Sequence, residues 1–477
     1  MTAFIPPPSP AVPVPRASAL SFKELPLPPG IHATLQQLEY LSMTPIQAAS
    51  LPIALAGHDL IAQAKTGSGK TAAFALTLLT KLNQRRFAVQ AMVLCPTREL
   101  AEQVAQEIRR LARFVDNIKV ITLCGGTTMR PQIASLEHGA HIVVGTPGRI
   151  IDHLERGSLQ LDALNTLVLD EADRMLDMGF YDDIAYVAKQ CPVERQTLLF
   201  SASFPEGITR LARQFLRNPQ EVKLLEQHES SKIRQRFYAV QHEERLQAVG
   251  LLLKHYRPIS TLAFCNTKQQ CRDLLDELHT QGIHALSLNG DMEQRDRDQV
   301  LIQFANRSCS VLVATDVAAR GLDIAQLEAV INVDITPDPE IHLHRIGRTG
   351  RAAEAGWALS LCSKSDQRRV ANIAQMMGNA PEWHELADLQ SDNDAPLVPP
   401  MVTLQIHGGR KEKIRAGDVL GALTGEAGFT REQVGKITVV DQSTYVAVAR
   451  DIALAAVTKL ARGKVKGKTV KVRALDD

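Results

Sequence analysis

Two long stretches of this chain alternate short apolar runs with amphipathic runs that have helical spacing, such as residues 100–114. A strand covered on both faces appears in the sequence as an unbroken apolar run, and alternation with helices is typical of parallel sheets. The pattern therefore predicts an α/β architecture with two tandem parallel-sheet domains. The segments expected to form strands are 59–63, 91–94, 141–144, 167–169 and 197–200 in the first stretch, and 260–264, 310–314 and 329–333 in the second.

The last part of the chain has shorter runs in a different order. Its pattern predicts strands at 402–406, 436–440, 444–448 and 469–472, with helices at 418–423 and 450–460. This β-α-β-β-α-β order resembles an RNA-recognition-motif fold, so we expect a C-terminal α+β domain. The expected boundaries are a proline-rich disordered leader at 1–17, domains at 18–225 and 226–384, an acidic, proline-bearing linker at 385–400, and the last domain at 401–477.

Composition narrows the class of protein. The 477 residues are 45% hydrophobic and 22% charged, which suits several buried cores. The sequence has no apolar run long enough to cross a bilayer and no basic segment followed by an apolar one at its start, so we expect a cytoplasmic protein without a membrane anchor. The seven cysteines are scattered without paired metal spacing, which favours reduced, mostly buried thiols over a zinc site.

Basic charge is concentrated at the C-terminal end. Residues 401–477 contain fourteen Lys and Arg against eight Asp and Glu, a net charge of +6, whereas the whole chain carries +2. The preceding residues therefore carry −4. Such a basic appendage is typical of a nucleic-acid contact.

A glycine-rich turn after the predicted strand at 59–63 predicts a phosphate-binding loop. Gly67 and Gly69 free the backbone to surround phosphates, Lys70 supplies a positive charge, and Thr71 supplies a hydroxyl for a metal ion. The same letters also occur in ordinary strand-to-helix turns, and Ala64 stands where the general pattern has glycine. The residues expected to bind nucleotide here are Ala64, Lys65, Thr66, Gly67, Ser68, Gly69, Lys70 and Thr71.

An acidic tetrapeptide, 170–173, directly follows the apolar run 167–169. Acidic clusters usually lie on a solvated surface, but this one is expected at the carboxyl edge of a buried strand, where ligands bind. Asp170 would make the second metal contact, and Glu171 would orient or deprotonate the attacking water. Together with the phosphate loop, this arrangement predicts hydrolysis of ATP with Mg²⁺.

From about residue 22 to 361, these motifs in this order resemble the DEAD-box RNA helicases. The resemblance implies that Gln47 pairs with the adenine edge and that Phe22 stacks on its ring. It also implies that Asp173, Ser201 and Ser203 couple hydrolysis to strand separation, with serine at 203 where the family usually has threonine. The first-domain residues implied to hold RNA phosphates are Pro96, Thr97, Arg98, Gly125, Gly126, Thr146 and Arg149.

The resemblance continues through the second domain. It implies that Gly321 and Asp323 contact ATP, and that Arg348 and Arg351 stabilise charge on the γ-phosphate when the two domains close. Arginine on a helix is more often a solvated surface residue, but positions three apart share one helix face. The second-domain residues implied to contact RNA are Thr267, Gly290, Gln294, Arg297 and Thr315.

The basic tail is similar to the C-terminal domain of the DbpA-type bacterial helicases through residues 417–425 and 464–468. That resemblance implies recognition of a structured element of 23S ribosomal RNA, so we expect remodelling of this RNA during assembly of the large (50S) subunit. We also expect the protein to be a monomer. Only Phe429 and Tyr445 are aromatic in the tail, so base stacking on its sheet should be weak. The residues expected to contact RNA are Lys411, Lys413, Arg415, Lys464, Lys466 and Lys468.

Three alternative functions can be compared with the sequence, and it argues against two of them. The tail could bind any RNA, because basic residues bind phosphate without reading sequence. The core could be an RNA clamp that binds ATP but hardly turns it over, although the complete set of catalytic residue types argues against this. A DNA helicase or a transporter-type ATPase has neither this adenine-reading segment nor this basic tail.

Overall fold

The computed structural model describes residues 21–64, 67–115, 117–204, 206–224, 233–319, 327–350, 355–389 and 396–475. The chain divides into two compact units, one before and one after about residue 227, which are described in turn. The leader and residues Lys65, Thr66, Gly321, Asp323 and Arg351 lie outside the described residues. Among the described helices, none combines the length and the apolar character needed to span a bilayer.

The first unit is built on a seven-stranded sheet in the order β3-β4-β2-β5-β6-β1-β7, with all strands parallel. Its strands are β1 Leu60–Gln63, β2 Ala91–Leu94, β3 Val120–Leu123, β4 Ile142–Gly145, β5 Thr166–Leu169, β6 Gln196–Ser201 and β7 Gln220–Lys223. Its helices are α1 Pro29–Gln37, α2 Pro45–Leu55, α3 Lys70–Lys81, α4 Arg98–Leu111, α5 Met129–Glu137, α6 Pro147–Glu155, α7 Ala172–Asp177, α8 Tyr181–Gln190 and α9 Glu206–Phe215, preceded by a short 3₁₀ turn, η1 Phe22–Glu24.

Two hydrophobic cores lie on the two faces of this sheet. Alternate strand residues point to opposite faces, so Val93 joins the core under α1 to α4 while Met92 joins the core under α6 to α9. Burial on both faces explains why these strands are continuous apolar runs in the sequence. The carboxyl ends of the strands then form one edge of the sheet.

The second unit begins with a sheet that repeats the first topology. Its parallel strands follow the order β10-β11-β9-β12-β13-β8-β14, the same path through seven strands as in the first unit. The strands are β8 Ile233–Ala239, β9 Thr261–Cys265, β10 Ala285–Leu288, β11 Val311–Thr315, β12 Ala329–Asn332, β13 Gly356–Cys362 and β14 Trp383–His384. The helices are α10 Arg245–Tyr256, α11 Lys268–Thr280, α12 Gln294–Ala305, α13 Asp316–Ala319, α14 Pro339–Ile346 and α15 Gln367–Met377, with 3₁₀ turns η3 Lys364–Asp366 and η4 Leu386–Asp388.

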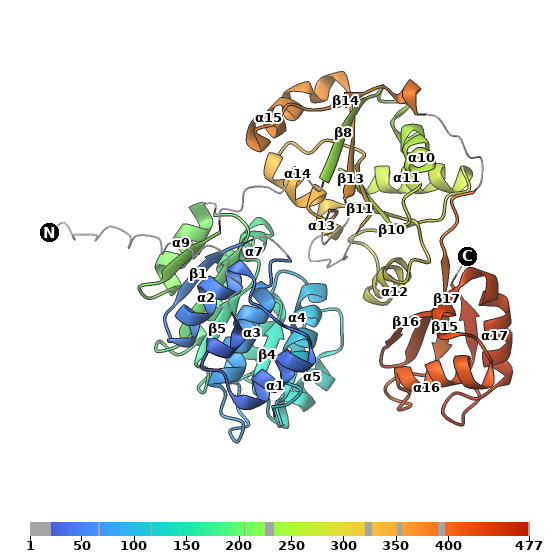
Figure 1. Cartoon of the computed structure of the whole chain (residues 1–477). Helices are drawn as coiled ribbons and strands as arrows, with labels where there is room; N and C mark the ends of the chain where they lie inside the picture. The colour runs from blue at the N-terminus through green and yellow to red at the C-terminus, as the bar shows by residue number, and fades with distance from the viewer. Residues whose placement is uncertain are drawn as a thin grey trace. The chain divides into compact units, whose positions relative to one another are not determined.

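The C-terminal part of this unit is a four-stranded antiparallel sheet in the order β16-β17-β15-β18. Figure 1 labels three of these strands, β15, β16 and β17, together with helices α16 and α17. The strands are β15 Met401–His407, β16 Val434–Val439, β17 Ser443–Ala449 and β18 Val472–Ala474. The helices are α16 Ala416–Gly421, continued by a π turn η5 Ala422–Glu426, and α17 Ala453–Arg462, with 3₁₀ turns η6 Arg431–Gln433 and η7 Arg450–Ile452. The predicted architecture of two parallel-sheet domains and a small α+β domain is thus confirmed.

Two local expectations differ from the structure. The last strand begins at Val472, not at residue 469, because the basic run before it forms a tight turn in which Lys466 and Gly467 have positive φ and Val465 bridges Lys468. At the two ends of the expected linker, Leu386, Leu389 and Leu397 pack against a hydrophobic core of the second parallel sheet. These leucine side chains therefore hold the described ends of the linker to the second parallel-sheet domain.

All seven cysteines are buried and unpaired, as the sequence analysis predicted for reduced thiols. Burial raises the pKa of Cys124, Cys309 and Cys362 to about 12 and that of Cys191 to about 11.

Candidate active site and RNA contacts

The phosphate loop joins β1 to α3 at the carboxyl edge of the first sheet. Gly67 and Gly69 have φ of 83° and 95°, a left-handed conformation that favours glycine. A Cβ at residue 69 would lie 2.5 Å from Gln47 Nε2, which donates to the Gly69 carbonyl at 3.1 Å. Gln47 also accepts from the Thr44 amide at 2.9 Å. The adenine-reading residue predicted from the sequence is therefore bonded directly to the loop.

Lys70 and Asp170 are buried beside this loop. Lys70 is only 6% exposed, and its ammonium donates a hydrogen bond to the Ala64 carbonyl at 2.6 Å. Burial raises the pKa of Asp170 to about 7; the Lys70 charge opposes this rise and Glu171 adds to it. A divalent cation would favour the ionised carboxylate, and carboxylate and hydroxyl oxygens from Asp170 and Thr71 suit Mg²⁺. The residues present therefore fit the metal that the sequence implied.

Glu171 has an unusual backbone. Its φ of 50° places a non-glycine residue in the left-handed region, at the residue preceding α7, which costs energy and is common at functional sites. Its carboxylate forms an ion pair with Arg174 at 3.1 Å, and both side chains are less than a tenth exposed. The turn and the arginine together fix where the carboxylate lies.

Asp173 joins the acidic segment to the end of β6. Its Oδ2 atom accepts from the Ala202 and Ser203 amides at 3.0 and 2.8 Å and from the Ser203 hydroxyl at 3.1 Å. The Ser201 hydroxyl donates to the Ser203 carbonyl at 2.7 Å. All three residues of the predicted coupling element are thus in one hydrogen-bonded group, and the serine at 203 makes the contact through its hydroxyl.

Phe22 is placed differently from what adenine stacking needs. Its ring is 3% exposed and packs edge-on to Tyr40, with centroids 6.2 Å apart, inside the first core. Stacking on a base would require the side chains that bury Phe22 to move, so this role stays a prediction.

The predicted RNA contacts of the first unit gather after β2, β3 and β4, which are neighbours in the sheet. Thr97 caps α4 by accepting from the Leu100 amide at 3.3 Å, and Pro96 precedes it. The Arg98 guanidinium lies over the Gly125–Gly126 turn, where a Cβ at 126 would be 1.8 Å from it.

The third group of predicted RNA contacts follows β4. Thr146 precedes α6. Arg149, on that helix, donates to the Thr127 carbonyl at 3.1 Å. Exposed amides at such helix starts bind phosphate.

Gln132 was missed by the sequence reasoning. Its side chain donates to the Cys124 carbonyl at 3.0 Å and accepts from Arg149 at 3.0 Å, so it ties the turn after β3 to α6. A glutamine a few residues after a Gly-Gly turn is too common a pattern to identify without knowing that the strands are adjacent.

In the second unit, the predicted contacts follow β9, β10 and β11, the corresponding three neighbours. Thr267 caps α11 by accepting from the Gln270 amide at 3.1 Å, and Thr315 ends β11. Gly290 follows β10, and Gln294 begins α12. Arg297, also on α12, donates to the Ala318 carbonyl at 2.7 Å. Arg348 is 5% exposed just after α14.

The basic residues of the C-terminal domain lie on two loops that touch. Lys411, Lys413 and Arg415 stand between β15 and α16, and Lys464, Lys466 and Lys468 between α17 and β18. All six are exposed, and Lys466 donates to the Lys413 carbonyl. The two loops are therefore in contact, and we call them together the basic loop pair.

The outer face of the C-terminal sheet is not open for stacking at its central strands. Tyr445 is 4% exposed and Gln405 is fully buried, joined by a hydrogen bond of 3.1 Å from the Gln405 amide to the Tyr445 hydroxyl. Beside them, Thr403 is hydrogen-bonded to Asn306 and Ser308. This arrangement agrees with the weak stacking expected from the shortage of aromatic residues.

Three family models match the chain in order: DEAD/DEAH box helicase at residues 44–211, helicase conserved C-terminal domain at 243–353 and DbpA RNA binding domain at 403–474. The ATP-dependent RNA helicase DbpA of Escherichia coli is 51% identical over 94% of this chain and 98% of its own length. The chain belongs to the DbpA-type DEAD-box RNA helicases. The Bacillus subtilis DbpA is 36% identical over the same shares of the two chains.

Solved structures of other DEAD-box helicases have the same core. Dbp5 of Saccharomyces cerevisiae, solved bound to RNA and ADP BeF3, has a TM-score of 0.71 and 31% identity over 78% of this chain and 97% of its own. As a DbpA-type DEAD-box helicase, the protein is an RNA-stimulated ATPase that binds RNA and uses ATP.

Proposed function

We propose that this helicase remodels short duplexes in 23S ribosomal RNA during assembly of the 50S subunit, as a cytoplasmic monomer. The observation that carries the proposal is the basic loop pair, in a domain that matches the DbpA RNA binding model. Basic charge is concentrated in this domain, whereas the rest of the chain is net acidic. This difference supports assigning RNA selection to the C-terminal domain and use of ATP to the residues before it.

In the proposed mechanism, the first unit binds ATP and the predicted RNA contacts of both units hold one strand. Lys70 and the loop amides hold the phosphates, while Gln47 and Phe22 contact the adenine. Bound Mg²⁺ would neutralise phosphate charge, and Thr71 and Asp170 are the residues that would hold it. Glu171 takes a proton from the attacking water. We propose the domain boundaries 18–225, 226–384 and 401–477 for these three parts.

Closure of the two units completes the reaction. Arg348 and Arg351 would then stabilise the developing charge on the γ-phosphate, and Gly321 and Asp323 would contact the nucleotide. Asp173 would transmit the change at the acidic segment to Ser201 and Ser203. Because the predicted RNA contacts lie on both units, a bound RNA strand would favour closure of the two units. Closure in turn would complete the site for ATP hydrolysis, which explains why RNA stimulates hydrolysis.

The experiment is a salt-dependent binding titration with the full-length protein and purified 23S ribosomal RNA. Lys464→Gln with Lys468→Gln removes two charges of the basic loop pair and should lower the slope of log affinity against log salt by about two. Arg431→Gln with Lys436→Gln removes two exposed charges elsewhere in the same domain and should change the slope by less.

Competition with unrelated RNA of equal length separates specific from general binding. The wild-type protein should prefer 23S ribosomal RNA at constant salt, and the Lys464/Lys468 variant should bind both RNAs more weakly because it has lost two phosphate contacts. Equal binding of both RNAs by the wild type would favour a general RNA remodelling enzyme and would contradict the ribosomal proposal.

A further inference from the structure

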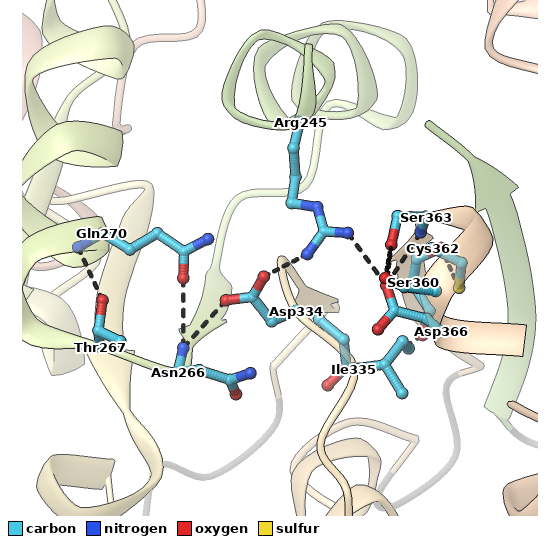
Figure 2. A network of polar contacts seen from close by, with 12 residues as sticks. Arg245, Asn266, Thr267, Gln270, Asp334, Ile335, Ser360, Cys362, Ser363 and Asp366 are labelled. Atoms are coloured by element: carbon cyan, nitrogen blue, oxygen red, sulfur yellow. Dashed lines mark hydrogen bonds and ion pairs between the residues drawn. The ribbon is translucent and has the colours of Figure 1, made fainter. Parts of the chain in front are cut away.

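Arg245 lies between two buried carboxylates in the second unit, at the first residue of α10 (Figure 2). One terminal nitrogen of its guanidinium donates to Asp334, and the other donates to Asp366 Oδ2 at 3.1 Å. The three residues are 4%, 7% and 4% exposed. None of them belongs to a motif to which the sequence gave a role.

Asp334 connects this arginine to the loop that carries a predicted RNA contact. Its Oδ2 atom accepts from the Asn266 amide at 3.1 Å (Figure 2), and Asn266 immediately precedes Thr267. Arg345, which is 1% exposed, donates to the Asn266 side chain at 3.2 Å and to the Asp334 carbonyl at 2.7 Å. Asn266 is therefore held by both its backbone and its side chain.

Arg345 extends the same chain of contacts to two further predicted functional positions. It binds the Asp316 carboxylate through two hydrogen bonds of 2.7 and 2.6 Å, and Asp316 directly follows Thr315. Its carbonyl accepts from the Arg348 amide at 3.2 Å. A single connected network thus reaches the backbone beside Thr267 and Thr315 and that of Arg348 itself.

The chemistry of Arg245 suits it to hold this network in one shape. A planar guanidinium can bond two carboxylates at once in fixed directions, whereas a lysine ammonium is a point charge on a flexible stem. Removing the guanidinium would also leave the buried Asp334 carboxylate without this counter-charge, a strongly unfavourable state, whereas Asp366 would keep its contact with Arg369. The position of the Asp334 carboxylate therefore depends on Arg245, and the position of the Asn266 backbone N–H depends on that carboxylate.

We propose that Arg245 is a positioning residue that keeps the RNA-contact loop at 266–267 and helix α14 in one arrangement, so that RNA binding and Arg348 act together. The proposal rests on the proposed roles of Thr267, Thr315 and Arg348. Arg245 itself contacts neither RNA nor nucleotide in this account. Its effect is on the RNA dependence of turnover, because the loop it orders is an RNA contact.

The test is steady-state ATP turnover by full-length Arg245→Lys, titrated with purified 23S ribosomal RNA and with poly(A). The apparent KM for either RNA should rise about tenfold, since small misplacements of a binding group are costly, while the KM for ATP stays within about twofold. Arg369→Lys is the matched control, because Arg369 contacts the same Asp366 at 3.1 Å from the surface, with its side chain 44% exposed. It should behave as the wild type.

A rescue experiment keeps the proposal testable if stronger variants fold poorly. Arg245→Met should raise the KM for RNA further, and adding Asp334→Asn should lower it again, because the amide removes the unpaired charge but keeps an oxygen for the Asn266 amide. An unchanged KM for RNA in Arg245→Lys, or a fall in kcat that only follows the loss of folded protein, would overturn the proposal.

Thr267→Val in the same assay distinguishes two kinds of failure. If Thr267→Val raises the KM for RNA and Arg245→Lys does not, the positioning role is wrong and the contact role stands. If neither variant changes it, the proposed RNA contact at Thr267 fails, and the inference fails with it.

Discussion

The two parallel sheets follow the same strand order but give the buried acids after their fifth strands different surroundings. Thr97 and Thr267 cap the helices after the second strand of each sheet with nearly equal angles, φ −130° and ψ 159° against φ −128° and ψ 153°. After the fifth strand, both sheets carry buried acids. In the first unit, the charge of Lys70 only partly offsets the effect of burial on the pKa of Asp170, whereas Asp334 of the second unit accepts a hydrogen bond from the guanidinium of Arg245.

This difference shows how one scaffold supports two tasks. In the first unit, burial raises the pKa of the carboxyl, so an external cation would gain much by binding it. In the second unit, Arg245 supplies the positive charge, and Asp334 holds the backbone N–H of Asn266 in place. The carboxyl edge of the first sheet is therefore suited to exchange a ligand, and that of the second sheet to hold its own loops in place.

The largest expected effect tests whether the second unit contributes to chemistry at all. Arg348→Ala should lower RNA-stimulated ATP hydrolysis by about three orders of magnitude, the effect of removing such an arginine in other phosphoryl-transfer systems. ATP binding without RNA should stay within about twofold, because the nucleotide contacts of the first unit are intact. Single-turnover hydrolysis and a binding titration measure the two quantities. Arg272→Ala, an exposed arginine of the same unit, is the control. Normal hydrolysis by Arg348→Ala would confine the chemistry to the first unit.

The next prediction concerns the acid that follows Asp170. Glu171→Gln should lower turnover by about two to four orders of magnitude while ATP and RNA still bind, since the amide keeps the shape but cannot accept the proton. Rapid-quench measurement of ADP formation, with binding of a labelled RNA in parallel, checks both parts. Hydrolysis within tenfold of the wild type would contradict the assigned role.

A smaller effect follows from the pKa of Asp170, which is raised from 3.8 to about 7 by burial. The folded protein without metal keeps this proton between about pH 4 and 7, where the unfolded chain has lost it, so the group's contribution to stability is lost as pH rises through that window. Mg²⁺ needs the ionised form, and protons compete with it below pH 7. Mg²⁺-dependent ATP affinity should therefore weaken by up to about tenfold between pH 7 and 6.

Fluorescence titration with a labelled ATP analogue at pH 6, 7 and 8, with Mg²⁺ and with EDTA, isolates this effect. The pH dependence should be present with Mg²⁺ and much weaker with EDTA. Equal slopes in the two conditions would show that another group is responsible.

The smallest expected effect compares the two helix caps directly. Thr97→Val and Thr267→Val each remove one capping hydroxyl, which should lower the free energy of unfolding by about 1 kcal/mol. Chemical denaturation of the two variants measures this change. Because the caps have the same geometry, the two losses should agree closely. A difference of several kcal/mol would show that one threonine has a further structural role.

Much of the fold follows from patterns that lie within single segments. The run 167–169 predicts a buried strand and thereby the edge position of Asp170, and the glycines at 67 and 69 predict the phosphate loop. The network around Arg245 could not be predicted in the same way, since Asn266, Asp334 and Arg345 meet only because β9 and β12 are neighbours. The buried ring of Phe22 and the late start of β18 depend likewise on packing and turn geometry.

The seven buried cysteines have a practical consequence for measurements on this protein. All seven thiols are buried, which limits their access to maleimide dyes, and burial raises the pKa of Cys124, Cys191, Cys309 and Cys362 to about 11 or 12, so the reactive thiolate of these four is scarce near neutral pH. New cysteines placed at exposed positions, such as Lys189 in the first unit and Arg272 in the second, should therefore label much faster than the native ones. Energy transfer between two such dyes would report the distance between the units as ATP and RNA are added, in a chain that keeps all its native residues elsewhere.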